Sequence, residues 1–258
     1  MKTLVLLVFI ILTSVIHAQD DIPELITDRP DQTESSSVVP HKSLQIETGF
    51  LLENDESEEL VKKSFAYNTT LFRYGLLENF ELRLGLEYLG QRTDVKNTDL
   101  SNTVKRLSPL YTGFKVRISD EQGWKPEMAF LGGLVLPFTA IGNFKPTYTA
   151  ASMRFSFSHT FSERVSLGYN LGAEWDGFTA EPGFFYSMAL GIGMTEKLGM
   201  FLESYGLIPE KSESEHMFDA GFTYLLLPNL QFDISGGIGL YNAFDHFISF
   251  GLSYRIPR

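Results

Sequence analysis

Charged side chains alternate with apolar ones along several segments of this sequence, and they are its best candidates for binding a polar molecule. Glu81 and Arg83 flank Leu82, for example, and Glu174 lies between Ala173 and Trp175. Side chains alternate between the two faces of a β-strand, so the charged residues would share one face. Opposite charges on that face can pair with each other or line a path for a solute. The set comprises eight acids and six bases: Glu47, Arg73, Glu81, Arg83, Glu87, Lys115, Arg117, Arg154, Glu174, Asp176, Glu203, Asp219, Asp233 and Arg255.

Catalytic residues and cofactor sites find little support. Ser214 and His216 have the two-residue spacing of a nucleophile and base on one strand face, and so do His41 and Ser43. A nucleophile also needs an oriented base and an oxyanion donor, which neither pair supplies by itself. The chain has no Cys, and no acidic loop has the ligand spacing of a calcium-binding loop. The sequence therefore predicts no catalytic residue, no metal site and no cofactor.

The overall composition excludes two further classes of protein. The 22 Phe and 11 Tyr among 258 residues do not occur in chains too polar to collapse, so wholesale disorder is excluded. The 21 basic and 32 acidic residues give a net charge of -11, which repels phosphate backbones. We expect no nucleic-acid partner.

The elements that must position the charged residues are β-strands, because the apolar residues repeat with a period of two. Helical periodicity is nearly absent beyond the N-terminus. Segments of about 9 to 12 residues are long for globular strands but suit tilted strands that cross a membrane. Twelve such segments are predicted, near residues 43–52, 64–75, 80–89, 107–118, 127–136, 148–161, 165–176, 184–194, 198–208, 216–226, 230–241 and 246–256.

The connections between these segments alternate between short turns and longer polar loops. An even number of strands, with tight turns at one end and long loops at the other, is typical of membrane barrels. Only a closed barrel satisfies every backbone group of a strand that faces lipid. The predicted fold is an all-β, transmembrane, antiparallel up-and-down β-barrel of about 12 strands. The alternative is a secreted β-sandwich, whose apolar faces would stack on each other.

The N-terminus indicates export. Lys2 is followed by a mostly apolar run to Ile16, and Ala18 precedes two aspartates. A basic start, a short apolar core and a small residue describe a secretory signal peptide, predicted here as residues 1–18. The run is too short for a spanning helix, which needs roughly 20 apolar residues. Together with a barrel at residues 43–258, it places the protein in the outer membrane of a bacterium, with outer-membrane lipid and the barrel-assembly machinery as partners.

Residues 19–42 form a polar segment between the signal peptide and the first predicted strand. Asp28, Arg29 and Asp31 surround Pro30, which restricts the backbone, and Glu34 adds a further charge. We expect this segment to act as an internal plug or latch whose charges contact the barrel wall. Arg29 is expected to pair with an inward carboxylate such as Glu47, Glu81 or Glu87. The alternative is a tail that tethers the barrel or recruits a partner.

Two stretches of the sequence also resemble a known family. The block Thr27-Asp-Arg-Pro-Asp-Gln-Thr33, Pro40, and the stretch Leu44-Gln-Ile-Glu-Thr-Gly-Phe50 are similar to the opening of a family of outer-membrane transporters named for meta-pathway phenol degradation. The strand pattern extends the resemblance over nearly all of the mature chain. The last residues, Gly251 to Arg258, depart from the terminal aromatic residue common in such barrels.

The resemblance implies transport and identifies no substrate. We therefore predict an outer-membrane pore or transporter for small, hydrophobic or aromatic molecules. Two alternatives belong to other classes: a structural or adhesin-like surface barrel without a permeant, and a barrel enzyme that hydrolyses lipid. A conductance measurement distinguishes the first alternative, and an assay of lipid hydrolysis the second.

Overall fold

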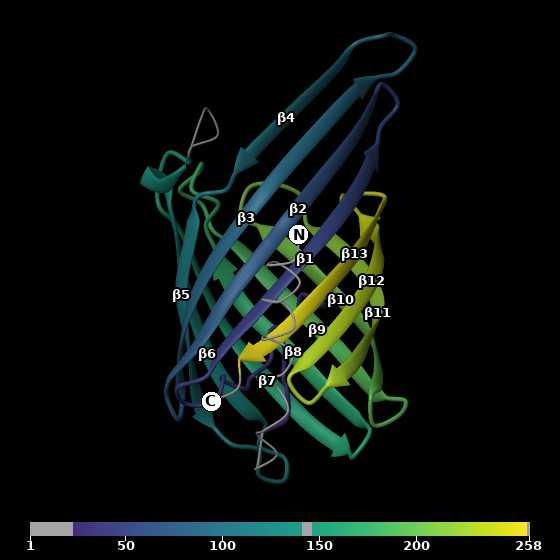
Figure 1. Cartoon of the computed structure of the whole chain (residues 1–258). Helices are drawn as coiled ribbons and strands as arrows, with labels where there is room; N and C mark the ends of the chain where they lie inside the picture. The colour runs from purple at the N-terminus through teal and green to yellow at the C-terminus, as the bar shows by residue number, and fades with distance from the viewer. Residues whose placement is uncertain (1–22, 141–145, 257–258) are drawn as a thin grey trace, which may run out of the picture.

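The protein is a closed antiparallel β-barrel (Figure 1). The computed structural model describes residues 23–140 and 146–256, so the predicted signal peptide lies outside the described residues. β1 pairs with both β2 and the last strand, β13, which closes the sheet. Twelve strands form the wall: β1 (Leu44–Glu56), β2 (Leu60–Leu77), β3 (Phe80–Val95), β5 (Leu110–Ser119), β6 (Glu127–Leu136), β7 (Ala150–Ser162), β8 (Val165–Glu174), β9 (Gly183–Gly193), β10 (Leu198–Pro209), β11 (Glu215–Leu227), β12 (Leu230–Tyr241) and β13 (His246–Ile256).

The remaining elements are short. β4 (Ser101–Leu107) pairs with the outer part of β3, and a 3-10 turn, η2 (Pro137–Thr139), follows β6. Within the part of the chain that the structure describes, no helix has the length and apolar character needed to cross a membrane. The predicted fold class and number of wall strands are confirmed.

The barrel is apolar outside and polar inside. Leu84, Leu171 and Phe250 are among the many large apolar side chains exposed on its outer face. The largest fully buried side chains include Arg73 and Lys115, which face the interior. A soluble sandwich would bury its apolar face and expose its charges. The observed arrangement suits lipid outside and a polar lumen inside, so the sandwich alternative is wrong.

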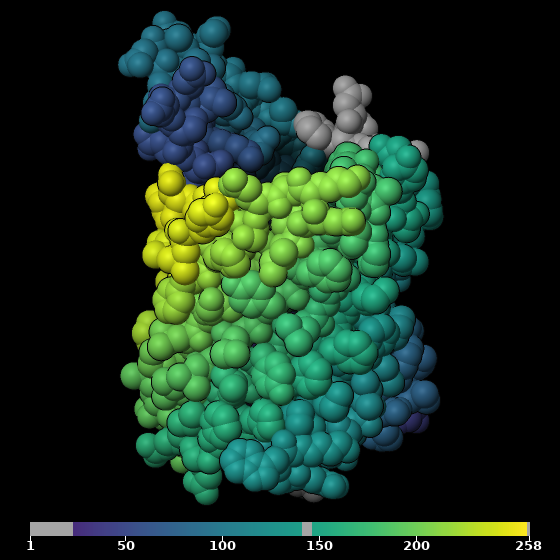
Figure 2. Space-filling model, turned by 180° about the vertical axis from the view of Figure 1, so that it is seen from behind, coloured from purple at the N-terminus to yellow at the C-terminus, as the bar shows by residue number. Residues whose placement is uncertain are grey.

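Four strands rise above the rest of the rim and form a projecting sheet (Figures 1 and 2). β1, β2 and β3 continue well past the predicted ends of their segments, and β4 adds a fourth strand beside β3. Residues 90–106, predicted as a loop, are mostly paired strand. The prediction failed because Gln91–Val95 and Ser101–Arg106 are mainly polar, so they lack the one-sided apolar pattern of a strand that faces lipid.

A charge on the outer face should destabilise the barrel. Phe155 on β7 is 44% exposed on that face, whereas Ser158 on the same strand lines a cavity inside the barrel. Phe155→Arg should cost roughly 2–4 kcal/mol of folding free energy in lipid, because a lipid-facing guanidinium loses its hydration. Ser158→Arg is the matched control and should cost far less. Heat-modifiable electrophoretic mobility and urea unfolding in vesicles measure the difference; equal costs would contradict the assigned faces.

Candidate functional site

The N-terminal segment, residues 23–43, lies inside the barrel as a loop with both ends at one rim. Arg255, beside the short turn between β11 and β12, donates from Nη1 to the carbonyl of Glu24 at 3.0 Å. The amide of Lys42 donates to the carbonyl of Gly75, beside the short turn between β2 and β3, at 2.7 Å. Between these ends the segment is largely buried, with Thr33 6% exposed. The lumen therefore contains a loop inserted from the short-turn rim.

Asp28 is the most strongly bonded residue of this segment. Its carboxylate lies 3.1 Å from Arg73 on β2, 2.8 Å from Arg83 on β3 and 2.9 Å from Lys115 on β5. We call these three bases the basic cluster. Burial raises the pKa of Asp28, but the three cations outweigh it and hold that pKa well below its ordinary value. An ionised Asp28 thus joins the inserted segment to three strands at once.

Wall carboxylates complete the network around the basic cluster. Arg73 donates to Glu47 at 2.8 Å and to Glu81 at 2.9 Å, and Glu47 also accepts the amide of Asp28 at 3.0 Å. Arg83 donates to Glu34 of the segment at 2.7 Å. All of these wall side chains are buried, and buried charges are stable only when paired and hydrogen-bonded.

Arg29 reaches another part of the wall, formed by β12 and β13. It donates to both oxygens of Asp233 on β12, at 2.9 and 3.3 Å, and to Ser249 on β13 at 3.1 Å. Gly49 and Gly251 make room for it, because a Cβ at either position would come within 2.5 Å of the guanidinium. The predicted bidentate pair exists, but its partner is Asp233. The predicted partners Glu47 and Glu81 are wrong, because the basic cluster already occupies them, and Glu87 lies elsewhere in the lumen.

Polar side chains of the wall bind the rest of the segment through its backbone and its hydroxyl groups. Glu203 on β10 accepts the amide of Gln32 at 2.7 Å and the Thr33 hydroxyl at 2.5 Å. Asn170 on β8 accepts the amide of Glu34 at 2.8 Å and donates to its carbonyl at 3.0 Å. Further along, Ser36 and Ser37 donate to Glu127, and the amide of Val39 donates to Glu81. The inserted conformation is therefore specified along its whole length.

The other predicted charged residues include Arg117, Arg154 and Asp176, and among these three Arg154 bonds the segment. Arg117 donates to the carbonyl of Glu78 at the short-turn rim, at 3.4 Å. Arg154 on β7 donates to the carbonyl of Gln32 at 3.3 Å, and its guanidinium lies 3.8 Å from the centre of the Phe185 ring and 4.0 Å from Glu174. Asp176 is not on the inner face: it follows the end of β8 and accepts amides of its own loop.

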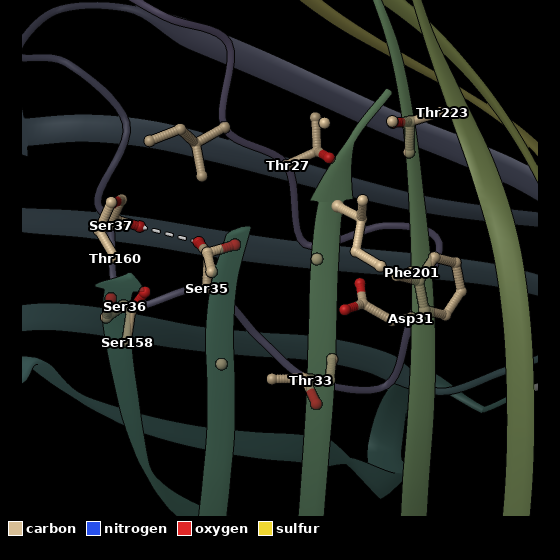
Figure 3. A pocket seen from close by; sticks show the side chains of 18 of the residues that line it. Thr27, Asp31, Thr33, Ser35, Ser36, Ser37, Ser158, Thr160, Phe201 and Thr223 are labelled. Atoms are coloured by element: carbon tan, nitrogen blue, oxygen red, sulfur yellow. Dashed lines mark hydrogen bonds between the residues drawn. The ribbon is translucent and has the colours of Figure 1, made fainter. Parts of the chain in front are cut away.

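Two cavities lie on opposite sides of the inserted segment. The inner cavity, of about 590 Å³, opens toward the short-turn rim and is rich in hydroxyl groups (Figure 3). The outer cavity, of about 440 Å³, lies toward the long-loop rim and combines apolar side chains with Glu87, Arg154 and Glu174. Arg29 and Glu34 border both cavities, so the segment separates them.

The Ser214–His216 pair is formed at the long-loop rim. His216 Nε2 lies 3.1 Å from the Ser214 hydroxyl, and its Nδ1 lies 2.8 Å from the Tyr186 hydroxyl. Within the described ranges, no carboxylate is bonded to His216, so the pair lacks an acid that would orient its base. Nor do these ranges contain a group of three His, Cys, Asp or Glu placed to hold a metal ion.

The sequence matches the profile of the family described as "Putative MetA-pathway of phenol degradation" over residues 27–256. The match begins at Thr27, inside the inserted segment, and ends at Ile256, the last residue of β13. It thus includes the loop in the lumen as well as the wall. None of the curated proteins matches the sequence.

Several solved membrane barrels resemble the structure. The COG4313 outer membrane channel from Pseudomonas putida F1 superposes with a TM-score of 0.67 at 10% identity, covering 90% of this chain and 100% of that chain. The KdgM porin in complex with disordered oligogalacturonate gives 0.53 at 8% identity, covering 81% and 98%. The translocator domain of the autotransporter NalP from Neisseria meningitidis gives 0.53 at 10% identity, covering 84% and 89%. At these identities the likeness concerns the fold, which is that of outer-membrane barrels.

Proposed function

We propose that this chain, which belongs to the family described as "Putative MetA-pathway of phenol degradation", is an outer-membrane channel for small molecules that its own N-terminal segment plugs. The observation that carries the proposal is the placement of the segment between two cavities, where it is bonded to Lys115 on one wall and to Glu203 on the wall across the barrel. Passage from one rim to the other requires this segment to move. A barrel with a purely structural role would need neither of the two cavities, nor a segment that occupies its lumen.

In this proposal the parts of the chain have separate roles. Residues 1–18 direct export and are removed, residues 19–42 form the plug, and residues 43–258 form the barrel. The barrel-assembly machinery inserts that barrel into outer-membrane lipid, which the exposed apolar outer face suits. The charged residues of the inner face then serve mainly to position the plug, and those of the outer cavity meet the permeant first.

The outer cavity favours a small permeant with an apolar body and one polar group. Tyr111, Leu131 and Val135 supply apolar wall, whereas Arg154 and Glu87 supply charge near it. Ligand sites commonly combine a mostly apolar lining with a few polar groups that fix orientation. An aromatic acid or a phenol has this character, and a sugar does not.

Uptake into proteoliposomes tests the channel and its preference. For each solute, the uptake rate of vesicles that contain the full mature chain is divided by that of protein-free vesicles. This ratio should be several-fold higher for benzoate and phenol than for arabinose. Val135→Asp, which places a charge on the apolar lining, should lower the ratio of benzoate to arabinose uptake. If the barrel assembles but vesicles with and without the protein take up every solute at the same rate, the structural or adhesin-like alternative would be favoured.

A further inference from the structure

Glu203 and Asp219 form a buried pair of acids beside the plug. They lie directly opposite each other on β10 and β11, and their exposures are 1% and 0%. Within the described residues, neither oxygen of the Asp219 carboxyl has a hydrogen-bond partner. The two carboxylate oxygens of Glu203 accept hydrogen bonds from Gln32 and Thr33 of the plug. Two acids so placed cannot both be ionised cheaply, because each charge is desolvated and repels the other.

Asp31 of the plug supplies a third carboxyl to this site. It lines the inner cavity together with Phe201 and Thr33 (Figure 3). Burial raises the pKa of Asp31 well above its ordinary value, and the nearby Glu203 carboxylate raises it further. The position of Asp31 on the cavity surface gives water from the short-turn rim access to the site.

The surroundings of these three acids contain little positive charge. Arg29 is bonded to Asp233, and Arg154 donates to the carbonyl of Gln32 and lies 4.0 Å from Glu174. The basic cluster is bonded to Asp28, Glu34, Glu47 and Glu81 on the wall across the barrel. The other titratable groups near the pair are themselves acidic: Tyr205 on β10 and Glu53 on β1. The plug thus meets cations on one wall and an uncompensated acidic pair on the other.

We propose that Asp31, Glu203 and Asp219 form a proton-binding site that stabilises the plug when protonated and expels it when ionised. The inference rests on the proposed function, since it concerns the regulation of that plug. A shared proton lets one carboxyl donate to another across the contact between plug and wall. Its loss to the inner cavity leaves like charges on Asp31 and on the wall, which repel each other.

The sign of the pH dependence follows from proton binding. The plugged state holds protons that the open state, with the carboxyls separated and hydrated, releases. Raising the pH therefore lowers the ratio of plugged to open channels, by up to about tenfold per pH unit for each proton released. Channels should be closed in acid and should open toward alkaline pH.

Conductance of the full mature chain in planar bilayers, from about pH 5 to about pH 9, tests this dependence. We expect the fraction of time spent open to rise at least about tenfold across that range. Ser36→Cys supplies a second readout, because Ser36 is 2% exposed and should react with a maleimide only when the plug leaves. Its labelling rate is compared with that of Asn79→Cys in a short turn, which corrects for ionisation of the thiol.

Three variants assign the effect. The Asp219→Asn and Asp31→Asn channels should each remain closed at alkaline pH. Asp31→Asn changes the plug and not the barrel wall, so it still tests the proposal if Asp219→Asn fails to assemble. Asp233→Asn removes the carboxylate partner of Arg29, so it should raise the fraction of time spent open at every pH, and that fraction should still increase with pH. Asp99→Asn, in an exposed loop, should behave as the wild type.

The outcomes separate this inference from the proposed function. A wild-type conductance that does not change with pH, or an unchanged dependence in both Asp219→Asn and Asp31→Asn, overturns the proton site. If removal of the plug still opens the channel in that case, the proposed function stands without this regulation. If removal of the plug changes nothing, the proposed function fails as well.

Discussion

Deleting residues 20–37 while keeping the signal peptide is expected to raise the single-channel conductance several-fold. The deletion removes the loop that separates the inner cavity, of about 590 Å³, from the outer cavity, of about 440 Å³. It leaves Val39, which lies shortly before β1 and whose amide donates a hydrogen bond to Glu81 on β3. This bond continues to hold the start of β1 against the wall. The two cavities then join into one path through a wall that is otherwise unchanged.

Planar bilayer recordings of the deletion variant measure this effect, and heat-modifiable mobility shows whether the barrel assembles. Gln32→Ala is a matched control, because the Gln32 side chain is exposed and the residue bonds the wall through its backbone amide and carbonyl, so the substitution should change conductance little. An assembled deletion variant whose conductance equals that of the wild type would show that residues 20–37 do not obstruct the path. The segment would then be a periplasmic tail, the alternative to the plug.

Most of the wall could be predicted from the sequence, because lipid imposes a strict rule on it. Side chains that face lipid, such as Leu84 and Leu171, must be apolar, so every second residue of a wall strand is apolar. This pattern locates a strand without knowledge of its partners. The rule ends where the lipid ends. β4 and the outer parts of β1 to β3 are polar on both faces, so their pairing depends on backbone hydrogen bonds between strands that periodicity does not reveal.

The candidate site was only partly predictable. The alternation placed Arg73, Arg83 and Lys115 on the inner face, and the proline-containing charge pattern identified the inserted segment. Which wall each charge faces depends on how the loop folds back on itself, so Asp233 could not be identified as the partner of Arg29. Asn170 gave no signal, because amide and hydroxyl side chains are ordinary at inward positions.

Asp28→Asn is expected to have the largest effect of any single substitution on the plug. The carboxylate of Asp28 neutralises Arg73, Arg83 and Lys115 within 3.1 Å. The amide has the same shape but no charge, so three buried cations lose a shared partner. Breaking a buried ion pair from one side costs about 3 kcal/mol or more, which corresponds to roughly a hundredfold change in an equilibrium. Single-channel recordings should show the fraction of time spent open rise by about that factor.

A double-mutant cycle distinguishes loss of this charge interaction from general damage. Lys115→Met removes one of the cations that Asp28→Asn leaves uncompensated, so the double variant should be more often closed than Asp28→Asn alone. The two single effects should therefore not add, because both substitutions act on one contact between plug and wall. Additive effects would mean that the Asp28 carboxylate stabilises the plug independently of Lys115, through Arg73 and Arg83. Asp28 contacts β2, β3 and β5 and Arg29 contacts β12 and β13, so the cycle measures how much of the plug's stability comes from the pairing of Asp28 with Lys115.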